Sequence, residues 1–263
     1  MNDLRKRLEA ELSVLPFIQT GFTLTPLNAG TVNSSYRLES ADKCYFVKTF
    51  ESDQIAKLDR QGLFDIQSAL LSEQLSVKPI YLSTTNHFQI DQWLESKTLD
   101  QIDLSRHSVC QTLARTLVRI HASKVTAPTL DLPAQWQHYI ELLGNQINAE
   151  DLRKLETYAQ TWFRACSINS VFCHNDLALS HITYGEPSHI FDWEYCALSC
   201  PYFDLASCIA VNGLGQADEA SLCAFYAQYS QYALSEVLSG VNAMKPLVEL
   251  TYRLWYQSAK LAV

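Results

Sequence analysis

The sequence predicts an α+β protein, with a small antiparallel sheet at the N-terminal end and a mainly helical region after it. Residues 22–94 contain five runs rich in β-branched and aromatic residues, separated by turn-forming or helical stretches, which is typical of strands. After residues 96–99 the apolar residues instead recur at helical spacing. We therefore predict two lobes, an N-lobe over residues 1–95 and a C-lobe over residues 96–263.

The elements are expected in a simple order along the chain. An amphipathic helix over residues 2–14 comes first, since Leu4, Leu8 and Leu12 recur among charged residues. The N-lobe strands are expected at 22–27, 34–39, 44–50, 78–83 and 86–94, with one helix inserted at 55–74. The C-lobe helices are expected at 104–122, 132–145, 150–166 and from about 203 to the end.

Two short segments of the C-lobe each run from apolar residues directly into acidic ones. Val171–Leu177 contains Asp176, and Ile190–Tyr195 contains Asp192, sixteen positions later. We expect each segment to begin as a short strand. Such a carboxylate pair suits phosphoryl transfer, because one can orient a hydroxyl nucleophile while the other holds a metal that neutralises phosphate charge. Alone, Asp176 would more often cap a turn or a helix, but the two segments together favour a catalytic site.

Composition limits the classes of partner. The chain has 263 residues, of which 48% are hydrophobic and 18% charged, as expected for a globular protein. Its net charge of −8 argues against nucleic acid or an anionic membrane and is compatible with a cationic small substrate. No apolar run approaches the roughly 18 residues that a membrane-spanning helix needs. With a charged N-terminus and eight scattered cysteines, we expect a cytoplasmic protein with free thiols and can assign no oligomeric state.

These motifs resemble the choline kinase, thiamine kinase and aminoglycoside phosphotransferase superfamily, which has a two-lobed, protein-kinase-like fold. Cys173–Leu177 looks very like the catalytic loop of choline kinases. Asp192–Tyr195, followed by Pro201–Ala206, is similar to a segment that choline and thiamine kinases share. Leu27–Asn33 looks like their nucleotide-covering hairpin. The resemblance implies an ATP- and Mg²⁺-dependent kinase of a small-molecule alcohol, with choline, ethanolamine or thiamine as the acceptor.

The resemblance also implies a role for each residue near the two segments. Asp176 would orient the acceptor hydroxyl, and Asp192 would hold the metal, since a carboxylate is a suitable hard donor for Mg²⁺. His174 is expected to be a structural residue of the loop, hydrogen-bonded to backbone. Asp204 resembles an aspartate that braces the catalytic loop from the following helix.

His181 departs from the family pattern, which has a metal-binding asparagine five residues after the catalytic aspartate. Imidazole nitrogen is a poor Mg²⁺ ligand and suits Mn²⁺ or Zn²⁺ better. Three interpretations are open: a site that works with one well-held metal, a site shifted toward Mn²⁺, or a site that has lost turnover. The first is favoured, since Asp192 and the nucleotide phosphates could still hold a metal.

Lys48 lies on the third predicted strand, where an ammonium could pair with the nucleotide phosphates. An alternative is an edge-strand lysine that limits aggregation. In the family, a glutamate on the following helix pairs with this lysine, but Leu63 stands at that position here. Asp65 would be rotated about 200° away on the helix, so Glu51 and Asp53 are other candidates and the partner is open.

The remaining nucleotide contacts are expected in two places. Gly30 and Asn33 define the hairpin over the nucleotide. Gln92, Trp93 and Leu94 would belong to a hinge whose backbone reads adenine, although a buried strand with Trp93 in the core is the alternative.

The acceptor site is expected beside the metal aspartate, at Glu194 and Tyr195. Tyr252, Trp255 and Tyr256 follow at helical spacing near the C-terminus. Aromatic rings with a carboxylate would select a quaternary or thiazolium cation, through cation–π attraction of about 0.5–2 kcal/mol per ring. Such a stripe is, however, more often part of a helix packed in a core.

Three alternatives compete with a choline- or thiamine-type kinase. The first is a weak or inactive kinase-like protein that binds a nucleotide or metabolite as a sensor or scaffold. The second is an aminoglycoside phosphotransferase, which would use the same chemistry on a polycation. The third is a zinc site, whose spacings match no common motif, formed from His174, His181, Cys173, Cys196 and Cys200.

Overall fold

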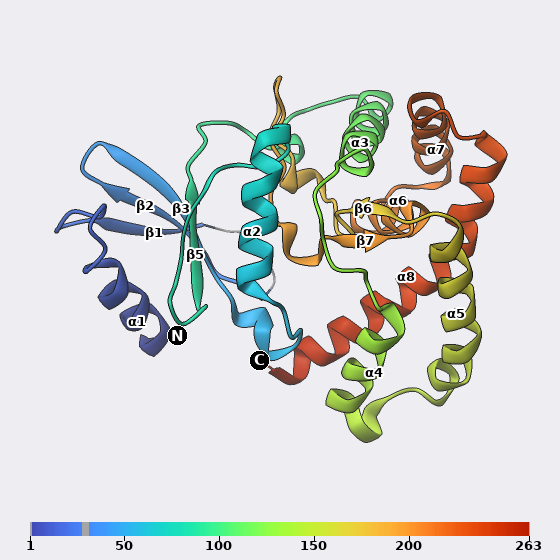
Figure 1. The fold of residues 1–263 in the computed structure, drawn as a ribbon, viewed down its shortest axis with the longest axis horizontal. Coiled ribbons are helices and arrows are strands. Elements are labelled where there is room, and N and C mark those ends of the chain that lie inside the picture. The colour runs from blue at the N-terminus through green and yellow to red at the C-terminus, as the bar shows by residue number, and fades with distance from the viewer. Residues whose placement is uncertain (1, 28–31, 263) are drawn as a thin grey trace. The chain divides into compact units, whose positions relative to one another are not determined.

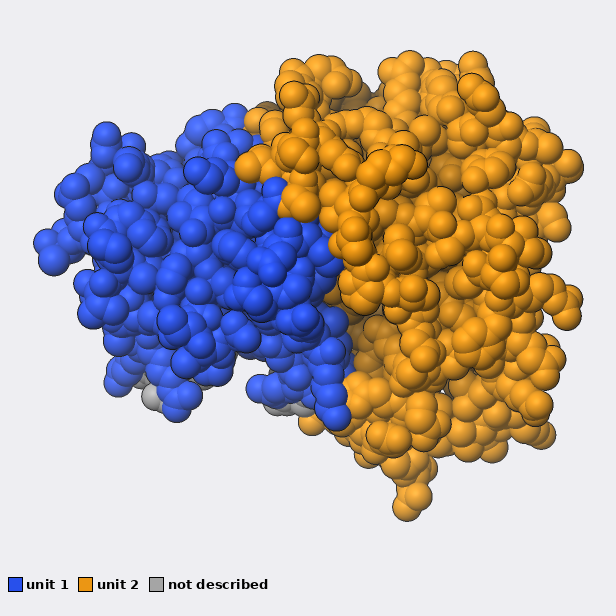
Figure 2. Space-filling view, in the orientation of Figure 1, with its two compact units in different colours: residues 1–68, 77–95 blue, residues 69–76, 96–263 orange. Residues whose placement is uncertain are grey.

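The computed structural model describes residues 2–27 and 32–262 (Figure 1). The chain forms two compact units, coloured blue and orange in Figure 2. Unit 1 comprises Met1–Ser68 and Val77–Glu95. Unit 2 comprises Ala69–Ser76 and Ser96–Val263. The short segment Ala69–Ser76 therefore belongs to the second unit, although it lies between two stretches of the first.

Unit 1 is built on a five-stranded antiparallel sheet with the strand order β1-β2-β3-β5-β4. The strands are β1 (Thr23–Leu27), β2 (Ser35–Ser40), β3 (Lys43–Thr49), β4 (Pro79–Leu82) and β5 (Phe88–Gln92). This sheet confirms the predicted antiparallel architecture of the N-lobe. Because β3 lies between β2 and β5, the alternative that Lys48 is an edge-strand residue is wrong.

The core of unit 1 lies between one face of this sheet and helix α1 (Asn2–Leu12). Leu8 and Leu12 of α1 pack in the same buried cluster as Tyr45 and Val47 of β3. Side chains alternate along a strand, and the burial of β3 follows that alternation. Lys48 therefore lies on the opposite face of the sheet, away from α1.

Helix α2 (Arg60–Leu70) is shorter than the helix predicted over residues 55–74. Its start is fixed by Asp59, whose Oδ1 accepts a hydrogen bond from the backbone N–H of Gly62 at 3.0 Å, as an N-cap residue does. Within the predicted range, residues 55–59 are not helical and Leu71–Glu73 form a short 3₁₀ turn instead. The prediction was wrong at its ends because local capping overrides apolar periodicity.

Unit 2 is mainly helical, as predicted for the C-lobe, and contains one two-stranded antiparallel ribbon. The ribbon pairs β6 (Val171–Cys173) with β7 (Ala197–Ser199). The helices are α3 (Arg106–His121), α4 (Leu132–Leu143), α5 (Ala149–Ile168), α6 (Pro201–Val211), α7 (Gln216–Ser230) and α8 (Leu234–Ala262). Helix α6 is buried along nearly its whole length, because it packs against α8, α3 and β6.

The second predicted strand of the catalytic region, at Ile190 and Phe191, is wrong. Ile190 makes only isolated bridges, to Ser76 and Ile182. The extended backbone ends at Asp192, which has a positive φ of 61° and leads into a 3₁₀ turn. The true partner of β6 is therefore β7, which begins five residues after Asp192.

Two expectations about the whole chain can be compared with the structure. The cysteines are all free thiols, as expected. Within the described residues, no helix combines the length and the apolar character that crossing a bilayer would require.

Candidate active site

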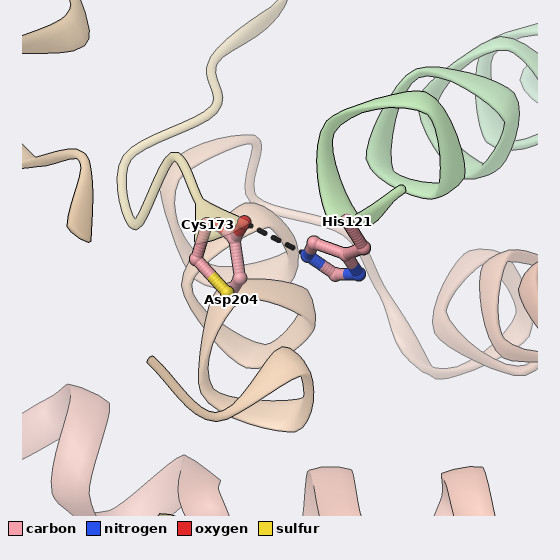
Figure 3. A group of neighbouring side chains, drawn as sticks. All are labelled: His121, Cys173 and Asp204. Atoms are coloured by element: carbon pink, nitrogen blue, oxygen red, sulfur yellow. Dashed lines mark hydrogen bonds and ion pairs between the residues drawn. The ribbon is translucent and has the colours of Figure 1, made fainter. Parts of the chain in front are cut away.

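Asp204 holds the loop that follows β6. It is fully buried on α6, and its carboxylate accepts hydrogen bonds from the backbone N–H of His174 at 2.9 Å and of Asn175 at 2.8 Å. Nε2 of His121, at the end of α3, lies 3.1 Å from the same carboxylate (Figure 3). Burial alone would raise the pKa of Asp204, but the contacts with His121 and His174 lower it below its ordinary value. The carboxylate therefore stays ionised and fixes the loop.

His121, Cys173 and Asp204 lie together and, within the described residues, are the three-residue group close enough to bind one metal ion (Figure 3). Burial raises the pKa of the Cys173 thiol well above its ordinary value, so the sulfur carries its proton in this arrangement. Nδ1 of His121 also lies 2.7 Å from the hydroxyl of Tyr226, which fixes the ring from its other side. The group is therefore suited to bracing rather than to metal binding. Of the zinc residues considered from sequence, it includes only Cys173.

His174 is a neutral, buried residue within the loop. Its Nδ1 accepts a hydrogen bond from the backbone N–H of Asp176 at 3.3 Å, and its Nε2 donates to the carbonyl of Phe191 at 2.9 Å. Burial, together with the charge of nearby His181, lowers the pKa of His174 to about 4. The ring thus ties the Asp176 loop to the segment before Asp192.

Asp176 lies at the end of this loop, partly buried. Oδ1 of its carboxylate accepts a hydrogen bond from the hydroxyl of Tyr252 on α8 at 3.1 Å. The pKa of Asp176 is raised to about 6, chiefly by burial and also by the charge of Asp192, although His181 and the Tyr252 hydrogen bond oppose the rise. A carboxylate with this pKa is mostly ionised at neutral pH and can accept a hydrogen bond from an alcohol.

Asp192 and His181 meet beside Asp176. Nε2 of His181 lies 3.6 Å from Oδ2 of Asp192, and both side chains are partly accessible. Nδ1 of His181 lies 2.9 Å from the backbone carbonyl oxygen of Asp176. The segment is also tied through backbone, since the N–H of Phe191 donates to the carbonyl of His181 at 2.8 Å. The three residues that sequence placed in the catalytic and metal sites are therefore neighbours.

Asp192 adopts the left-handed backbone conformation, which is uncommon for a residue other than glycine. Such a conformation costs about 1–3 kcal/mol and persists where the surrounding structure enforces it. The Nε1–H of Trp193 donates to the carbonyl of Ile190 at 3.0 Å, and this bond spans the turned residue. Strained backbone of this kind is frequent at ligand-binding sites.

The predicted acceptor residues form a second group around Asp176. Nε1 of Trp255 donates to the hydroxyl of Tyr195 at 3.0 Å, and the Tyr195 carbonyl accepts from the side-chain amide of Asn175 at 2.9 Å. Tyr252 and Trp255 are partly buried, whereas Tyr256 is 52% exposed and packs edge-on against Trp255. The three aromatic residues of α8 therefore differ: Tyr252 contacts Asp176, Trp255 contacts Tyr195, and Tyr256 faces solvent.

Glu194 follows Asp192 in the 3₁₀ turn Trp193–Tyr195 and is partly buried. Burial raises the pKa of Tyr195 well above its ordinary value, and the charge of Glu194 raises it further. Glu194 acts in the same direction on buried Tyr139 of α4. Its carboxylate therefore lies within electrostatic reach of two tyrosines. Tyr139 was not predicted from sequence, because it looks like any apolar position of α4.

Sequence reasoning also missed two polar residues, Ser207 within α6 and Asn212 directly after its last residue. The Ser207 hydroxyl donates to the carbonyl of Asn175 at 2.6 Å and lies 2.9 Å from the Tyr252 hydroxyl. Asn212 accepts from the N–H of Leu179 and donates to the carbonyl of Leu177, at 2.8 and 2.9 Å. The available signal was their spacing after Asp204 within an otherwise apolar helix.

The predicted nucleotide residues lie in unit 1. Oδ1 of Asn33 accepts from the backbone N–H of Ser52 at 2.8 Å, so Asn33 joins two turns. Gly30 lies outside the described residues. Gln92 is the last residue of β5, and Trp93 and Leu94 follow it. Trp93 is only partly buried, so the alternative that it belongs to the core is wrong.

The carboxylates considered as partners of Lys48 have other contacts in the structure. Asp53 binds Arg60 with a shortest distance of 2.6 Å. Glu51 accepts hydrogen bonds from Thr49 at 2.8 Å and from Ser34. Asp65 is exposed and accepts from Gln61 at 3.0 Å.

A buried polar cluster lies on the face of the sheet that carries Lys48. Gln89 pairs with Lys48 across β3 and β5, and Asp91 lies two residues further along β5. Nε2 of Gln89 lies 2.7 Å from Asp91 Oδ1, and Nε2 of Gln67, from α2, lies 3.2 Å from the same atom. Sequence reasoning missed this cluster, although Gln67 stands one helical turn after Leu63.

Known structures share this fold. Choline kinase LicA from Streptococcus pneumoniae matches with a TM-score of 0.75 and 19% sequence identity, over 98% of this chain and 91% of that chain. A structure of LicA in complex with AMP matches with a TM-score of 0.75 and 18% identity, over 97% and 90%. At these identities the likeness concerns the fold, and it confirms the predicted protein-kinase-like architecture.

Two curated relatives match at the level of sequence. Protein LicA from Haemophilus influenzae is 29% identical over 143 residues, which are 51% of this chain and 42% of that protein. Ethanolamine kinase 2 from Homo sapiens is 22% identical over 244 residues, 87% of this chain and 62% of that protein. The chain thus spans between two fifths and two thirds of the length of these relatives.

The fold and the paired aspartate segments point to a phosphotransferase class, and the family comparison agrees. The model described as "Phosphotransferase enzyme family" matches residues 23–246. The chain therefore belongs to the phosphotransferase enzyme family.

Proposed function

We propose that the protein is an ATP-dependent kinase that phosphorylates the hydroxyl of a small cationic alcohol of the choline or ethanolamine type. The observation that carries this proposal is the position of Asp176. Its carboxylate, held by Tyr252, lies beside the His181–Asp192 pair and next to the aromatic group of Tyr195 and Trp255. The relatives named choline kinase and ethanolamine kinase support this choice over thiamine.

In this proposal Asp176 orients the acceptor hydroxyl for attack on the γ-phosphorus. Phosphoryl transfer passes through a loose transition state, so correct positioning contributes more than a strong base. The ionised carboxylate accepts the hydroxyl hydrogen bond and receives the proton as the new O–P bond forms and the bond from the γ-phosphorus to the leaving ADP breaks. Asp204, His174 and Ser207 act indirectly, because they fix the loop on which Asp176 lies.

Asp192 would hold the divalent metal, with His181 as its neighbour. A carboxylate oxygen is a donor that Mg²⁺ accepts, and the Asp192 side chain is accessible enough to bind an ion. When bound, the metal neutralises charge on the phosphates. Asp192 and His181 therefore fit a metal, although one donor is nitrogen rather than oxygen.

The nucleotide would be held by unit 1, through Lys48 at the phosphates and Gln92, Trp93 and Leu94 at the base. Asn33 would shape the covering hairpin. The AMP complex of LicA, whose fold is similar, supports a nucleotide as ligand. We place the enzyme in the cytoplasm, where ATP is available and thiols stay reduced.

The cation of the acceptor would lie against Tyr195, Tyr252 and Trp255, with Glu194 supplying negative charge. Each ring would contribute about 0.5–2 kcal/mol through cation–π attraction. Tyr195 and Trp255 are already hydrogen-bonded to each other, which fixes their rings before a ligand binds. A neutral alcohol would lose this attraction.

A phosphate-transfer panel tests the proposal. Purified protein is incubated with ATP and Mg²⁺ or Mn²⁺ over choline, ethanolamine, thiamine and an aminoglycoside, with Asp176→Asn as the matched inactive control. We expect turnover on choline or ethanolamine that disappears in the control. Nucleotide binding without turnover on any acceptor, with either metal, would contradict the proposal and favour a sensor.

A further inference from the structure

The ring of His181 is fixed in one tautomer. Its Nδ1 lies 2.9 Å from the carbonyl oxygen of Asp176, which can only accept, so Nδ1 carries a proton. The backbone N–H of Ala178 is also near Nδ1, at 3.4 Å, but donates to the same Asp176 carbonyl at 3.1 Å. The carbonyl bond therefore decides the tautomer. It leaves Nε2 of the neutral ring with a free lone pair.

This nitrogen lies close to the carboxylate of Asp192. The distance of 3.6 Å between Nε2 and Oδ2 is too long for a hydrogen bond. It is, however, a separation that one cation can bridge with bonds of about 2.1 Å to each atom. Metal-binding histidines commonly donate their other N–H to a backbone carbonyl, as His181 does here.

We propose that Nε2 of His181 and Oδ2 of Asp192 together bind a divalent transition metal, Mn²⁺, in preference to Mg²⁺. The inference rests on the proposed function for the identity of the site. Mg²⁺ binds almost entirely through oxygen, whereas Mn²⁺ accepts an imidazole nitrogen beside a carboxylate. Of the three interpretations open from sequence, the structure therefore favours a shift of metal rather than a single-metal site.

The direct test uses Mn²⁺ alone with the full-length chain, without ATP or acceptor. Electron spin-echo spectroscopy of bound Mn²⁺ detects the ¹⁴N nucleus of a coordinated imidazole. We expect this ¹⁴N signal in the wild type and in His107→Asn, an exposed histidine of α3. It should disappear in His181→Asn.

Titration gives a second readout on the same variants. His181→Asn should weaken Mn²⁺ binding by about tenfold without weakening Mg²⁺ binding, since the asparagine carbonyl is an oxygen donor. Absence of the ¹⁴N signal in the wild type would overturn the proposal, as would its persistence in His181→Asn. The ¹⁴N signal would be absent from the wild type if protonated His181 and Asp192 form an ion pair in place of a metal site. Because neither readout requires turnover, failure here is distinct from failure of the kinase proposal.

A second observation, in unit 1, concerns Lys48. Asp91 is buried at 8% exposure on the sheet face of Lys48, diagonal to it across β3 and β5. Such diagonal neighbours lie about 7–8 Å apart at Cα, within reach of a lysine side chain. The side-chain amides of Gln67 and Gln89 both donate to Oδ1 of Asp91 and so hold its carboxylate.

We infer that Asp91 is the carboxylate that positions the Lys48 ammonium, in place of a helix glutamate at Leu63. This step also rests on the proposed function, because it assigns Lys48 to the nucleotide phosphates. Asp91 is a positioning residue, since it acts through the lysine.

A double-mutant cycle on nucleotide affinity tests this coupling. Asp91→Asn should weaken binding of a fluorescent ATP analogue by about tenfold in the wild-type background but not in Lys48→Met. Asp65→Asn, on the exposed side of α2, serves as the control. Equal losses in both backgrounds would overturn the inference. If the analogue binds neither the wild type nor the Asp65→Asn control, the kinase proposal itself fails.

Discussion

Tyr252 of α8 donates its hydroxyl hydrogen to Oδ1 of Asp176, from a residue 76 positions further along the chain. The bond ties the candidate catalytic carboxylate to the last helix. The same hydroxyl lies 2.9 Å from Ser207, which in turn holds the backbone of the loop. The orientation of Asp176 is therefore fixed from both its side chain and its backbone.

Tyr252→Phe should shift the acidic limb of the pH–rate profile to higher pH. The carboxylate must be ionised, so activity is lost as pH falls through the pKa of Asp176. The Tyr252 hydrogen bond lowers that pKa, and its loss should raise it by up to about one unit. The profile of kcat against pH is the measurement, with Tyr256→Phe on the exposed side of α8 as the control. An unchanged limb would contradict the role given to the tyrosine.

Asp176→Asn should reduce phosphate transfer by about 10²–10⁴-fold while nucleotide affinity stays near normal. The amide keeps the size of the side chain but cannot accept the acceptor's proton. Turnover and nucleotide affinity are measured on the same preparation, with thermal melting as the check on folding. Full turnover in this variant would show that the carboxylate does not take part in the chemistry.

Buried His174 should make the protein less stable in mild acid. Burial lowers its pKa to about 4 from the ordinary 6.5. Between these values the unfolded chain binds a proton that the folded chain does not, so unfolding becomes easier as pH falls. The free energy of unfolding should therefore fall by about 1.4 kcal/mol per pH unit within this window. The stability that depends on the neutral, buried ring is fully present above pH 6.5 and is lost as pH falls to 4.

Urea unfolding at several values of pH measures this slope. His174→Asn should be less stable at pH 7, because it loses the hydrogen bonds of the ring, yet show a smaller slope below pH 6.5. The same slope in both proteins would assign the acid sensitivity to other groups.

Gly240→Ala should destabilise the packing of α8 against α6. A Cβ at position 240 would overlap the ring of Tyr202, whose hydroxyl is held by Glu236 at 2.6 Å. Overpacking costs about 1–3 kcal/mol, and the better helix propensity of alanine offsets about 1 kcal/mol of it. The free energy of unfolding in urea is the measurement. Ser239→Ala, exposed on the same helix, should change it by less than about 0.5 kcal/mol.

The sheet of unit 1 was predictable because its strands carry local signals. Tyr45 and Val47 alternate with half-buried residues, and a two-residue turn joins β2 to β3. The helix predicted at 55–74 and the strand at Ile190 were wrong for a shared reason. Asp59 caps one element and the positive φ of Asp192 ends the other, and neither is visible in apolar periodicity.

The candidate site was predictable only in part. Asp176, His181 and Asp192 could be identified from motif spacing within one short stretch of chain. Tyr139 and Ser207 could not, because their contribution depends on how distant helices pack. The tautomer of His181 depends on a single backbone carbonyl, and residue types carry no information about its direction.

The buried carboxylate of Asp204 couples the mobility of the candidate catalytic loop to that of α6. The backbone N–H groups of His174 and Asn175 both donate hydrogen bonds to the Asp204 carboxylate. They can exchange with solvent deuterium only when the helix and the loop separate, which requires opening much of the core of unit 2. These two amides should therefore be among the last to exchange, so the residues next to Asp176 would open only in rare, large-scale fluctuations of this unit.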